Sequence, residues 1–333
     1  MSKKMMWSTL VHLTMNMWGS KGDYMYWDDK SWDKLIDECE KYRINTIVLD
    51  LGDGIQYKSH PEISVRGAWS HERVREEIAK CKAKGITIIP KLNFAAAHDN
   101  WLGEYHQMLS TSVYYKVCKD LINEVSELFE NPEYIHLGMD EEDHGHAEAE
   151  DLVIFRQKDL LFHDLRYLVD CVKETGAKPW IWHDNLFYFP EKFKSLFSTD
   201  EVIISPWHYY AFKKEHFTPI ASSKLYTNYY TKGIFAEMNL EYVEEDPFFL
   251  TYHEQMIPNA EYGFKYVPCA SLCFNCKCNH DDTLEYFRDN VSKDSILGFM
   301  TAPWFALPSE KLDFYIDSLK SLDDARRKFF PED

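Results

Sequence analysis

Short apolar runs alternate along this chain with longer segments in which apolar residues recur three and four positions apart. The runs INTIVLDL at 44–51 and ITIIPKLNF at 86–94 have the pattern of buried strands. Between them, the segment 31–43 has one apolar face, typical of an amphipathic helix and formed by Trp32, Leu35, Ile36 and Cys39. The next helix begins at the N-cap residue Ser70 and ends just before Gly85. The pattern therefore predicts strands that alternate with helices.

The whole chain follows this pattern. Eight strands are expected at 6–15, 44–51, 86–94, 134–142, 178–187, 201–210, 265–273 and 295–305. Further helices are expected at about 111–130, 147–175, 247–262, 281–292 and 309–328, and an irregular, tyrosine-rich insertion at about 208–245. Such an alternation implies parallel pairing through right-handed crossovers, and eight parallel strands can close into a barrel without exposed edges.

We therefore predict one domain over 1–333, a (β/α)8 TIM barrel of the α/β class with the insertion after its sixth strand. An open, doubly wound sheet is the alternative. It is disfavoured because no glycine-rich phosphate turn follows the first strand.

A barrel would bring polar and aromatic residues together at one rim. Active sites of TIM barrels lie at the carboxyl ends of the strands. The residues expected at those ends are Asn93, His98, Asp140, Glu141, Trp182, His183, Asp184, Trp207, His208 and Trp304. The sequence therefore predicts a ligand cleft at this rim.

The stretch HLGMDEEDHGH at 136–146 places four acidic residues in a row after an apolar strand. Like charges this close repel one another, and partial burial adds to the effect, so at least one carboxyl should have a raised pKa. Such a group suits general acid catalysis. A solvated acidic loop is the alternative interpretation. We expect Glu142 and Asp143 to be the solvated start of a helix, and His136 to be a hydrogen-bonded core residue that supports the carboxylates or contacts the substrate.

Composition narrows the choice of partners. Aromatic residues make up 16% of the chain, and tryptophan and tyrosine line carbohydrate clefts as well as cores. The formal net charge of −18 argues against binding to nucleic acid or to an anionic membrane surface. No apolar run approaches the roughly 20 residues of a membrane span. The N-terminus lacks the apolar stretch and cleavage site of a signal peptide, so a cytoplasmic location is the default expectation. Export is the alternative, if a signal peptide had already been removed from this sequence.

Four of the eight cysteines cluster in CASLCFNCKC at 269–278. The spacing lacks the paired C-x-x-C knuckles of a strong zinc motif, so reduced thiols are the favoured interpretation over a metal site or a disulfide. The other four cysteines lie in expected helices, where buried free thiols are the expected state.

Taken together, several of these segments resemble the family-20 glycoside hydrolases, the β-N-acetylhexosaminidases. The family places an adjacent Asp-Glu pair after His-x-Gly-x at the end of the fourth barrel strand, and HLGMDE at 136–141 is similar, with Met139 where a second glycine is usual. PKLNFAAAH at 90–98 resembles the family's Pro and later His, without its acidic residues or its Pro-Gly. WHD at 182–184 resembles the family's Trp-x-Asp, and Trp207 and Trp304 match aromatics that wall the acetamido pocket.

The resemblance implies substrate-assisted, retaining hydrolysis of a β-linked N-acetylhexosamine or a related sugar, without a metal or other cofactor. Glu141 would be the general acid and base, and Asp140 would orient the substrate's acetamido group. Because neighbouring residues of a strand face opposite sides, the strand must end or bulge at Asp140 for both carboxylates to reach one ligand. Substrate contacts are expected from His98, Trp182, Asp184, Trp207, Trp304, His136 and a tyrosine of the insertion, Tyr229 or Tyr230.

The chain departs from the family pattern in three places. It begins on the first strand, so we expect the family's small α/β domain ahead of the barrel to be absent. The family's sugar-binding Arg near the end of that strand has no match, and His12 and Asn16 stand there instead. WFAL at 304–307 lacks the Glu that commonly follows the last-strand Trp. The reaction class can therefore carry over while the substrate differs.

Two other functions stay open. A metal-dependent barrel enzyme would use Asp140, Glu141, His144, His146 and His183, which are ligand types for zinc or manganese. A carbohydrate-binding barrel without turnover would fit the missing Arg and Glu, but such a protein has no reason to retain a repelling Asp-Glu pair.

Overall fold

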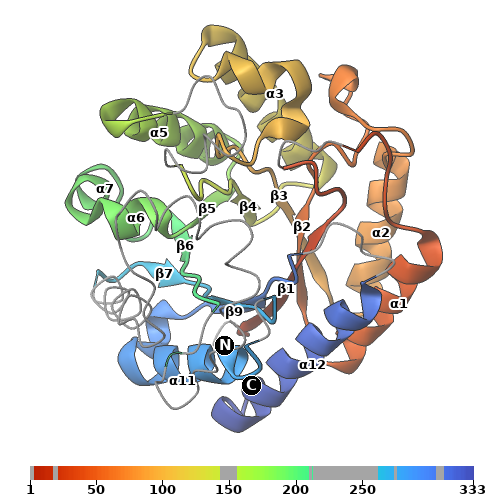
Figure 1. Ribbon diagram of the computed structural model, residues 1–333, viewed down its shortest axis with the longest axis vertical. Helices are drawn as coiled ribbons and strands as arrows, with labels where there is room; N and C mark the ends of the chain where they lie inside the picture. Colours follow the sequence, from red (N-terminus) through yellow and green to blue (C-terminus); the bar gives the residue numbers. More distant parts are fainter. Residues whose placement is uncertain are drawn as a thin grey trace, which may run out of the picture.

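A computed structural model describes residues 4–17, 22–142, 156–209, 212, 262–273, 276–304 and 311–333. Nine parallel strands form one sheet in the order β7-β6-β5-β4-β3-β2-β1-β9-β8. The strands are β1 (Met6–His12), β2 (Thr46–Asp50), β3 (Thr87–Lys91), β4 (Tyr134–His136), β5 (Lys178–Trp182), β6 (Ile203–Ser205), β7 (Lys265–Tyr266), β8 (Cys269–Ala270) and β9 (Gly298–Thr301). Figure 1 shows them in a ring at the centre of the molecule, with helices around it.

The two shortest strands are halves of one barrel strand. β7 pairs with β6, and β8 pairs with β9. The residues between these halves hydrogen-bond on both sides, because Val267 N donates to Ile204 O at 2.9 Å and Met300 N donates to Pro268 O at 2.8 Å. Pro268 has no N–H to give to the ladder, which accounts for the interruption. The sheet therefore closes, and the predicted eight-stranded TIM barrel is confirmed.

Helices cover the outside of the barrel, as Figure 1 shows. They are α1 (Asp29–Lys41), α2 (His71–Ala83), α3 (Ser112–Leu128), α5 (Lys158–Glu174), α6 (Asp184–Tyr188), α7 (Pro190–Leu196), α11 (Asn279–Asn290) and α12 (Leu312–Phe329), with 3-10 turns at Pro61–Ile63, Asn100–Met108 and Lys293–Ser295. Side-chain caps fix three of the starts, since Asp28, Ser70 and Thr111 each accept a hydrogen bond from a backbone N–H in the first turn.

Some boundaries differ from the sequence-based expectation. β4 ends at His136 instead of 142, and β5 ends at Trp182, after which α6 occupies most of the remaining expected strand. Both differences arise at the rim, where positive φ values at Gly138, Met139 and Glu141 turn the chain out of the strand conformation and α6 begins at Asp184. The expected helix at 247–262, apart from its last residue, and nearly all of the insertion at 208–245 lie outside the described residues.

The core has two layers. The larger lies between the sheet and the helices and includes the buried face of α1. The smaller fills the barrel and includes Leu10, Val48, Ile89, Trp180 and Met300. A TIM barrel is packed in this way down its centre, so a ligand can meet the barrel strands at the rim.

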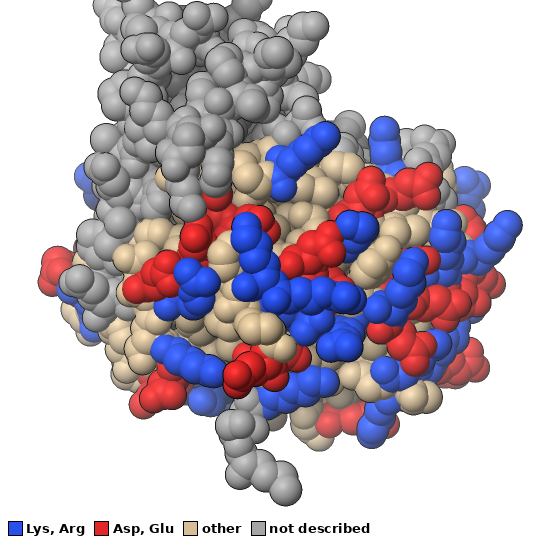
Figure 2. All heavy atoms as spheres, turned by 90° about the horizontal axis from the view of Figure 1, so that it is seen from below, with Lys and Arg blue, Asp and Glu red and all other residues tan. Residues whose placement is uncertain are grey.

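Charged side chains of both signs are interspersed on the face that Figure 2 shows. Among the described residues, many charged side chains form exposed pairs, such as Lys84 with Glu40 at 2.6 Å, and pairs of this kind contribute little to stability. The net charge of −18 is therefore not gathered into one acidic patch on this face. Among the described residues, none of the helices has the length and apolar composition needed to cross a membrane.

Candidate active site

The turn after β4 brings two neighbouring carboxyl groups to the same side. The residues Gly138, Met139 and Glu141 have φ values of 72°, 67° and 54°, in the left-handed region. This conformation breaks the alternation of a strand, as expected if both carboxylates are to reach one ligand. Non-glycine residues rarely adopt it, so its presence at Met139 and Glu141 indicates backbone strain of the kind that occurs at functional sites.

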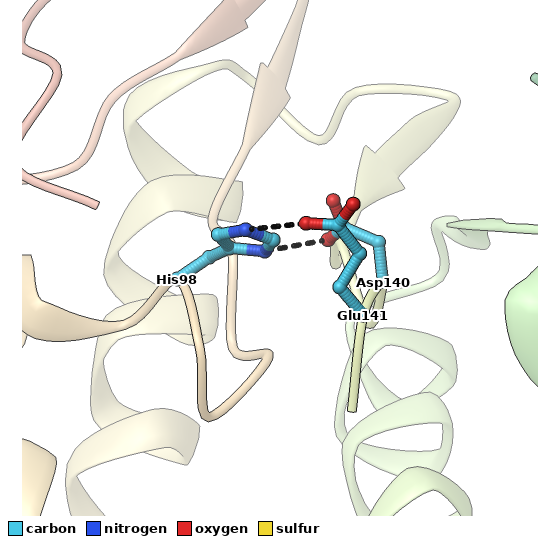
Figure 3. Close-up of side chains that lie close together, drawn as sticks. All are labelled: His98, Asp140 and Glu141. Atoms are coloured by element: carbon cyan, nitrogen blue, oxygen red, sulfur yellow. Dashed lines mark ion pairs between the residues drawn. The ribbon is translucent and has the colours of Figure 1, made fainter. Parts of the chain in front are cut away.

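The ring of His98 faces both carboxylates, which lie close together on the same side of it (Figure 3). Its Nδ1 is 3.3 Å from Asp140 Oδ1, and its Nε2 is 3.1 Å from Glu141 Oε2. The side chain of Asp140 is 8% exposed and that of Glu141 is 26% exposed. The pair thus has a buried member and a member that solvent or a ligand can reach, with one imidazole contacting both.

The surroundings of the pair fix the charge of Asp140. Burial favours its neutral form, but the charge and contact of His98, the charge of Lys91 and the hydrogen bond from Asn93 Nδ2 together lower the pKa of Asp140 below its usual value. Burial also lowers the pKa of His98, whereas Asp140 and Glu141 raise it by more, so that it lies well above its usual value. Repulsion within the pair therefore does not control Asp140, because its surroundings favour the carboxylate while those of His98 favour the imidazolium.

Asp184 connects the acidic pair to an aromatic residue of the rim. Its Oδ1 accepts a hydrogen bond from Glu141 N at 3.1 Å, and its Oδ2 accepts one from Trp207 Nε1 at 2.9 Å. Burial first, and then the charge of Asp140, raise the pKa of Asp184 to about 7. Asp184 therefore holds the backbone of Glu141 in place and titrates near neutrality.

The aromatic residues predicted for the cleft occupy two levels. Trp182 is fully buried and packs on His136 and Trp304, with ring centroids 4.9 and 5.8 Å away. Trp207 and Trp304 are partly exposed at the rim. Tyr229 and Tyr230 lie outside the described residues.

His136 supports the turn beneath the carboxylates. It is buried, and its Nδ1 accepts a hydrogen bond from Gly138 N at 3.0 Å. Burial lowers the pKa of His136 well below its usual value, so the ring is neutral. This is the core role, supporting the site, that its place in the strand suggested.

The expectation for Glu142 is wrong. Instead of facing solvent, its side chain is 3% exposed and lies 2.5 Å from Nη1 of the buried Arg156. Ala96 N also donates to Glu142 at 2.8 Å, while burial raises the pKa of Glu142. The acidic residues of the run therefore differ in their surroundings, because Glu142 forms a buried ion pair. Asp143 lies outside the described residues.

A second group of charges lies at the ends of the first three strands. Asp50 Oδ2 is 2.5 Å from Lys91 Nζ and 2.9 Å from His12 Nδ1, and all three residues are buried. Burial opposes ionisation of Asp50, but Lys91 and His12 outweigh it and lower the pKa of Asp50 to about 2. Sequence reasoning missed Asp50 and Lys91, although charged residues inside apolar strand runs were the available signal, and it placed Asn93 at the rim without its hydrogen bond to Asp140.

The site around the acidic pair also has residue types that bind metal ions. The ligand atoms of His98, Asp140 and Glu141 all lie within 4.8 Å of one another. His183 is not part of this group. Its ring packs against Phe187 and Trp207, and burial lowers the pKa of His183 to about 3. His144 and His146, also considered as ligands, lie outside the described residues.

Comparisons with models of known protein families and with curated protein sequences find no match. Solved structures do match. A β-N-acetylhexosaminidase from Bacteroides fragilis NCTC 9343 superposes with a TM-score of 0.65 at 17% identity, covering 97% of this chain and 65% of that one. A GH20 exo-β-N-acetylglucosaminidase from Vibrio harveyi in complex with N-acetylglucosamine gives 0.61 at 14%, covering 96% and 54%. Dispersin B gives 0.58 at 12%, covering 97% and 99%.

The chain thus spans 65% and 54% of the lengths of the first two enzymes and almost the whole length of Dispersin B. At these identities the likeness concerns the fold. The protein is a (β/α)8 barrel similar to the catalytic barrels of family-20 glycoside hydrolases.

Proposed function

We propose that this protein is a glycoside hydrolase that removes β-linked N-acetylhexosamine, or a related sugar, from chain ends by substrate-assisted, retaining hydrolysis. The observation that carries the proposal is the contact of one buried His98 with both Asp140 and Glu141 at the barrel rim. The barrel likeness to β-N-acetylhexosaminidases supports it.

The two carboxyl groups have different roles in this reaction. Glu141, the more exposed of the two, protonates the glycosidic oxygen as the bond to the anomeric carbon breaks. The carbonyl oxygen of the substrate's own 2-acetamido group attacks that carbon, giving a cyclic intermediate and the free alcohol. Glu141 then takes a proton from water, whose oxygen opens the intermediate and yields the sugar with its original configuration.

Asp140 must stay charged throughout. A carboxylate there accepts a hydrogen bond from the acetamido N–H and offsets the positive charge that develops on the acetamido group. The lowered pKa of Asp140 fits this requirement. His98 fixes the distance between the two groups and, at 3.1 Å from Glu141 Oε2, is placed to exchange a proton with that carboxyl.

The remaining contacts belong to the proposal as well. Trp207 and Trp304 form the walls against the sugar, with Trp182 and His136 beneath them. Asp184 acts on the substrate through its hydrogen bonds to Glu141 N and Trp207. Tyr229 is proposed to donate a hydrogen bond to the acetamido oxygen.

The test is hydrolysis of aryl N-acetyl-β-glucosaminide and its galactose-configured analogue. We expect wild type to release the aryl group and Glu141→Gln to lose about 10²–10⁴-fold in kcat, the contribution of a general acid. Asp140→Asn should lose activity on these compounds too. Glu76→Gln, an exposed glutamate of α2, is the matched control and should behave as wild type. Absence of turnover by wild type on both compounds would contradict the proposal.

A metal-dependent hydrolase is the second candidate, because the atoms of His98, Asp140 and Glu141 are close enough to share one ion. Against it, the raised pKa of His98 favours a protonated ring, and a ligand imidazole must lose that proton. The purified protein should hydrolyse the aryl substrates at an unchanged rate after treatment with a chelator. Loss of activity that added zinc or manganese restores would favour the metal enzyme instead.

A further inference from the structure

Two cysteines at the start of α11 form a close pair. Cys276 Sγ lies 3.4 Å from Cys278 Sγ. A tight turn brings them together, because Asn279 N donates to Cys276 O at 3.1 Å and Cys278 is the N-cap residue of the 12-residue helix. Cys278 is partly exposed, and Lys277 between the two is exposed. The pair therefore has a buried member, Cys276, and a member that solvent can reach, Cys278, at the positive end of a helix dipole.

The pair differs chemically from the deeply buried cysteines. Burial raises the pKa values of Cys39, Cys81, Cys118, Cys171 and Cys269, which keeps these thiols protonated and unreactive. In contrast, a hydrogen bond from Cys278 lowers the pKa of Cys276, and the same bond raises the pKa of Cys278. The thiol of Cys276 therefore loses its proton more readily than the buried thiols do.

We propose that Cys276 and Cys278 are a redox-active dithiol, which small disulfides of the glutathione class oxidise to an intramolecular disulfide. Once one thiol of the pair has lost its proton, its thiolate attacks one sulfur of oxidised glutathione, forming a mixed disulfide and releasing one glutathione thiolate, which takes up a proton. The second cysteine then loses its proton and displaces the other glutathione. In total, two protein thiols become one disulfide and one glutathione disulfide becomes two thiols, so the electrons balance.

The dithiol is connected to the rim of the barrel. Asn279, next to Cys278, donates through Nδ2 to His208 O at 2.8 Å and accepts through Oδ1 from Ser271 N at 2.8 Å. His208 precedes Tyr209, whose ring stacks on Trp207 at 5.3 Å. A covalent bond between the two sulfurs alters the first turn of α11, so its effect should reach the segment 207–209. This connection does not depend on the reaction that the rim carries out.

The experiment uses the full chain, equilibrated without oxygen in buffers of reduced and oxidised glutathione. Remaining thiols are alkylated, and the peptide that carries 276–278 is examined by mass spectrometry. We expect its two thiols to disappear together as the oxidised fraction of glutathione rises, and to return when reduced glutathione is restored. Hydrogen exchange in the peptide containing 207–209 should change over the same range.

The variants separate this pair from other thiols. Cys276→Ser should stop at a mixed disulfide of glutathione with Cys278, because no second sulfur is present to displace it. Cys273→Ser, the partly buried cysteine just before the pair, should oxidise as wild type does. Two results would overturn the proposal: both thiols of wild type stay open to alkylation in oxidised glutathione alone, or the Cys273→Ser change abolishes the disulfide.

Discussion

Gly138→Ala is a one-carbon change that should disturb the site strongly. Gly138 has φ +72, and a Cβ built there would lie 1.9 Å from Asn93 Oδ1. Asn93 cannot remain in place beside it. Its Nδ2 donates to Asp140 Oδ1 at 3.0 Å, and its Oδ1 accepts from Ala95 N at 3.0 Å. The substitution therefore acts on Asp140 through Asn93.

The expected loss of stability has two parts. Placing an alanine at positive φ costs about 1–2 kcal/mol, and losing a hydrogen bond to a charged carboxylate costs about 1.5–3 kcal/mol. Together they lower the free energy of unfolding by about 2.5–5 kcal/mol. An unfolding entropy of about 2.1 cal/mol/K per residue gives roughly 0.7 kcal/mol/K for 333 residues, so Tm should fall by about 4–7 °C.

The matched control is Gly176→Ala. Gly176 has φ +89 and nothing within 4 Å of a built Cβ, so only the conformational cost applies there, and Tm should fall by about 1–3 °C. The assay is calorimetric unfolding of both variants, together with hydrolysis of the aryl substrates. In an Asn93→Ala background, Gly138→Ala should cost no more than Gly176→Ala. Equal Tm shifts for the two single variants, with unchanged turnover, would refute the reasoning.

Two further predictions concern buried charges. Arg156→Met removes the cation that compensates Glu142, and we expect urea denaturation to show a loss of about 3–5 kcal/mol, with part of it recovered in the double variant with Glu142→Gln. Burial opposes ionisation of Asp50, but the charge of Lys91 contributes most to lowering the pKa of Asp50 from 3.8 to about 2. The stabilisation that the ionised Asp50 gives the fold is therefore present above pH 3.8 and is lost as pH falls toward 2. Asp50→Asn should therefore flatten the dependence of the unfolding free energy on pH between about 4 and 2, a change of about 2 kcal/mol; an unchanged slope would contradict the assignment.

Local sequence patterns predicted much of the barrel because each element leaves a local signature. The apolar face of α1 and the cap at Ser70 follow from spacing alone, and both are present. The carboxyl ends of parallel strands must meet at one rim, which is why His98, Asp140 and Asp184 were expected together. Their hydrogen bonds and ion pairs confirm that they lie together.

What the sequence did not reveal depends on partners far along the chain. Glu142 looked solvated because its cation, Arg156, lies beyond the acidic run and approaches only when the loop folds back. The partnership of Lys91 with Asp50 requires neighbouring strands to be in register, with Asp50 opposite Lys91 in the ladder. Local spacing does not encode such a pairing. Charged residues within apolar runs therefore indicated which positions are unusual but not which residues they pair with.

The difference between Asp140 and Glu141 also comes from the surroundings of the pair. Considered alone, two adjacent carboxyls are interchangeable, and repulsion can raise the pKa of either one. In the folded chain, Asp140 faces His98 and Asn93 and lies in the field of the charge of Lys91, whereas Glu141 is the more exposed member and lies against the second nitrogen of the same imidazole. The residue held as a carboxylate can stabilise positive charge but has no proton to give. If the site hydrolyses glycosides, we predict that Glu141 is the acid of the pair, and exchanging the two residues should abolish turnover although the composition of the site is unchanged.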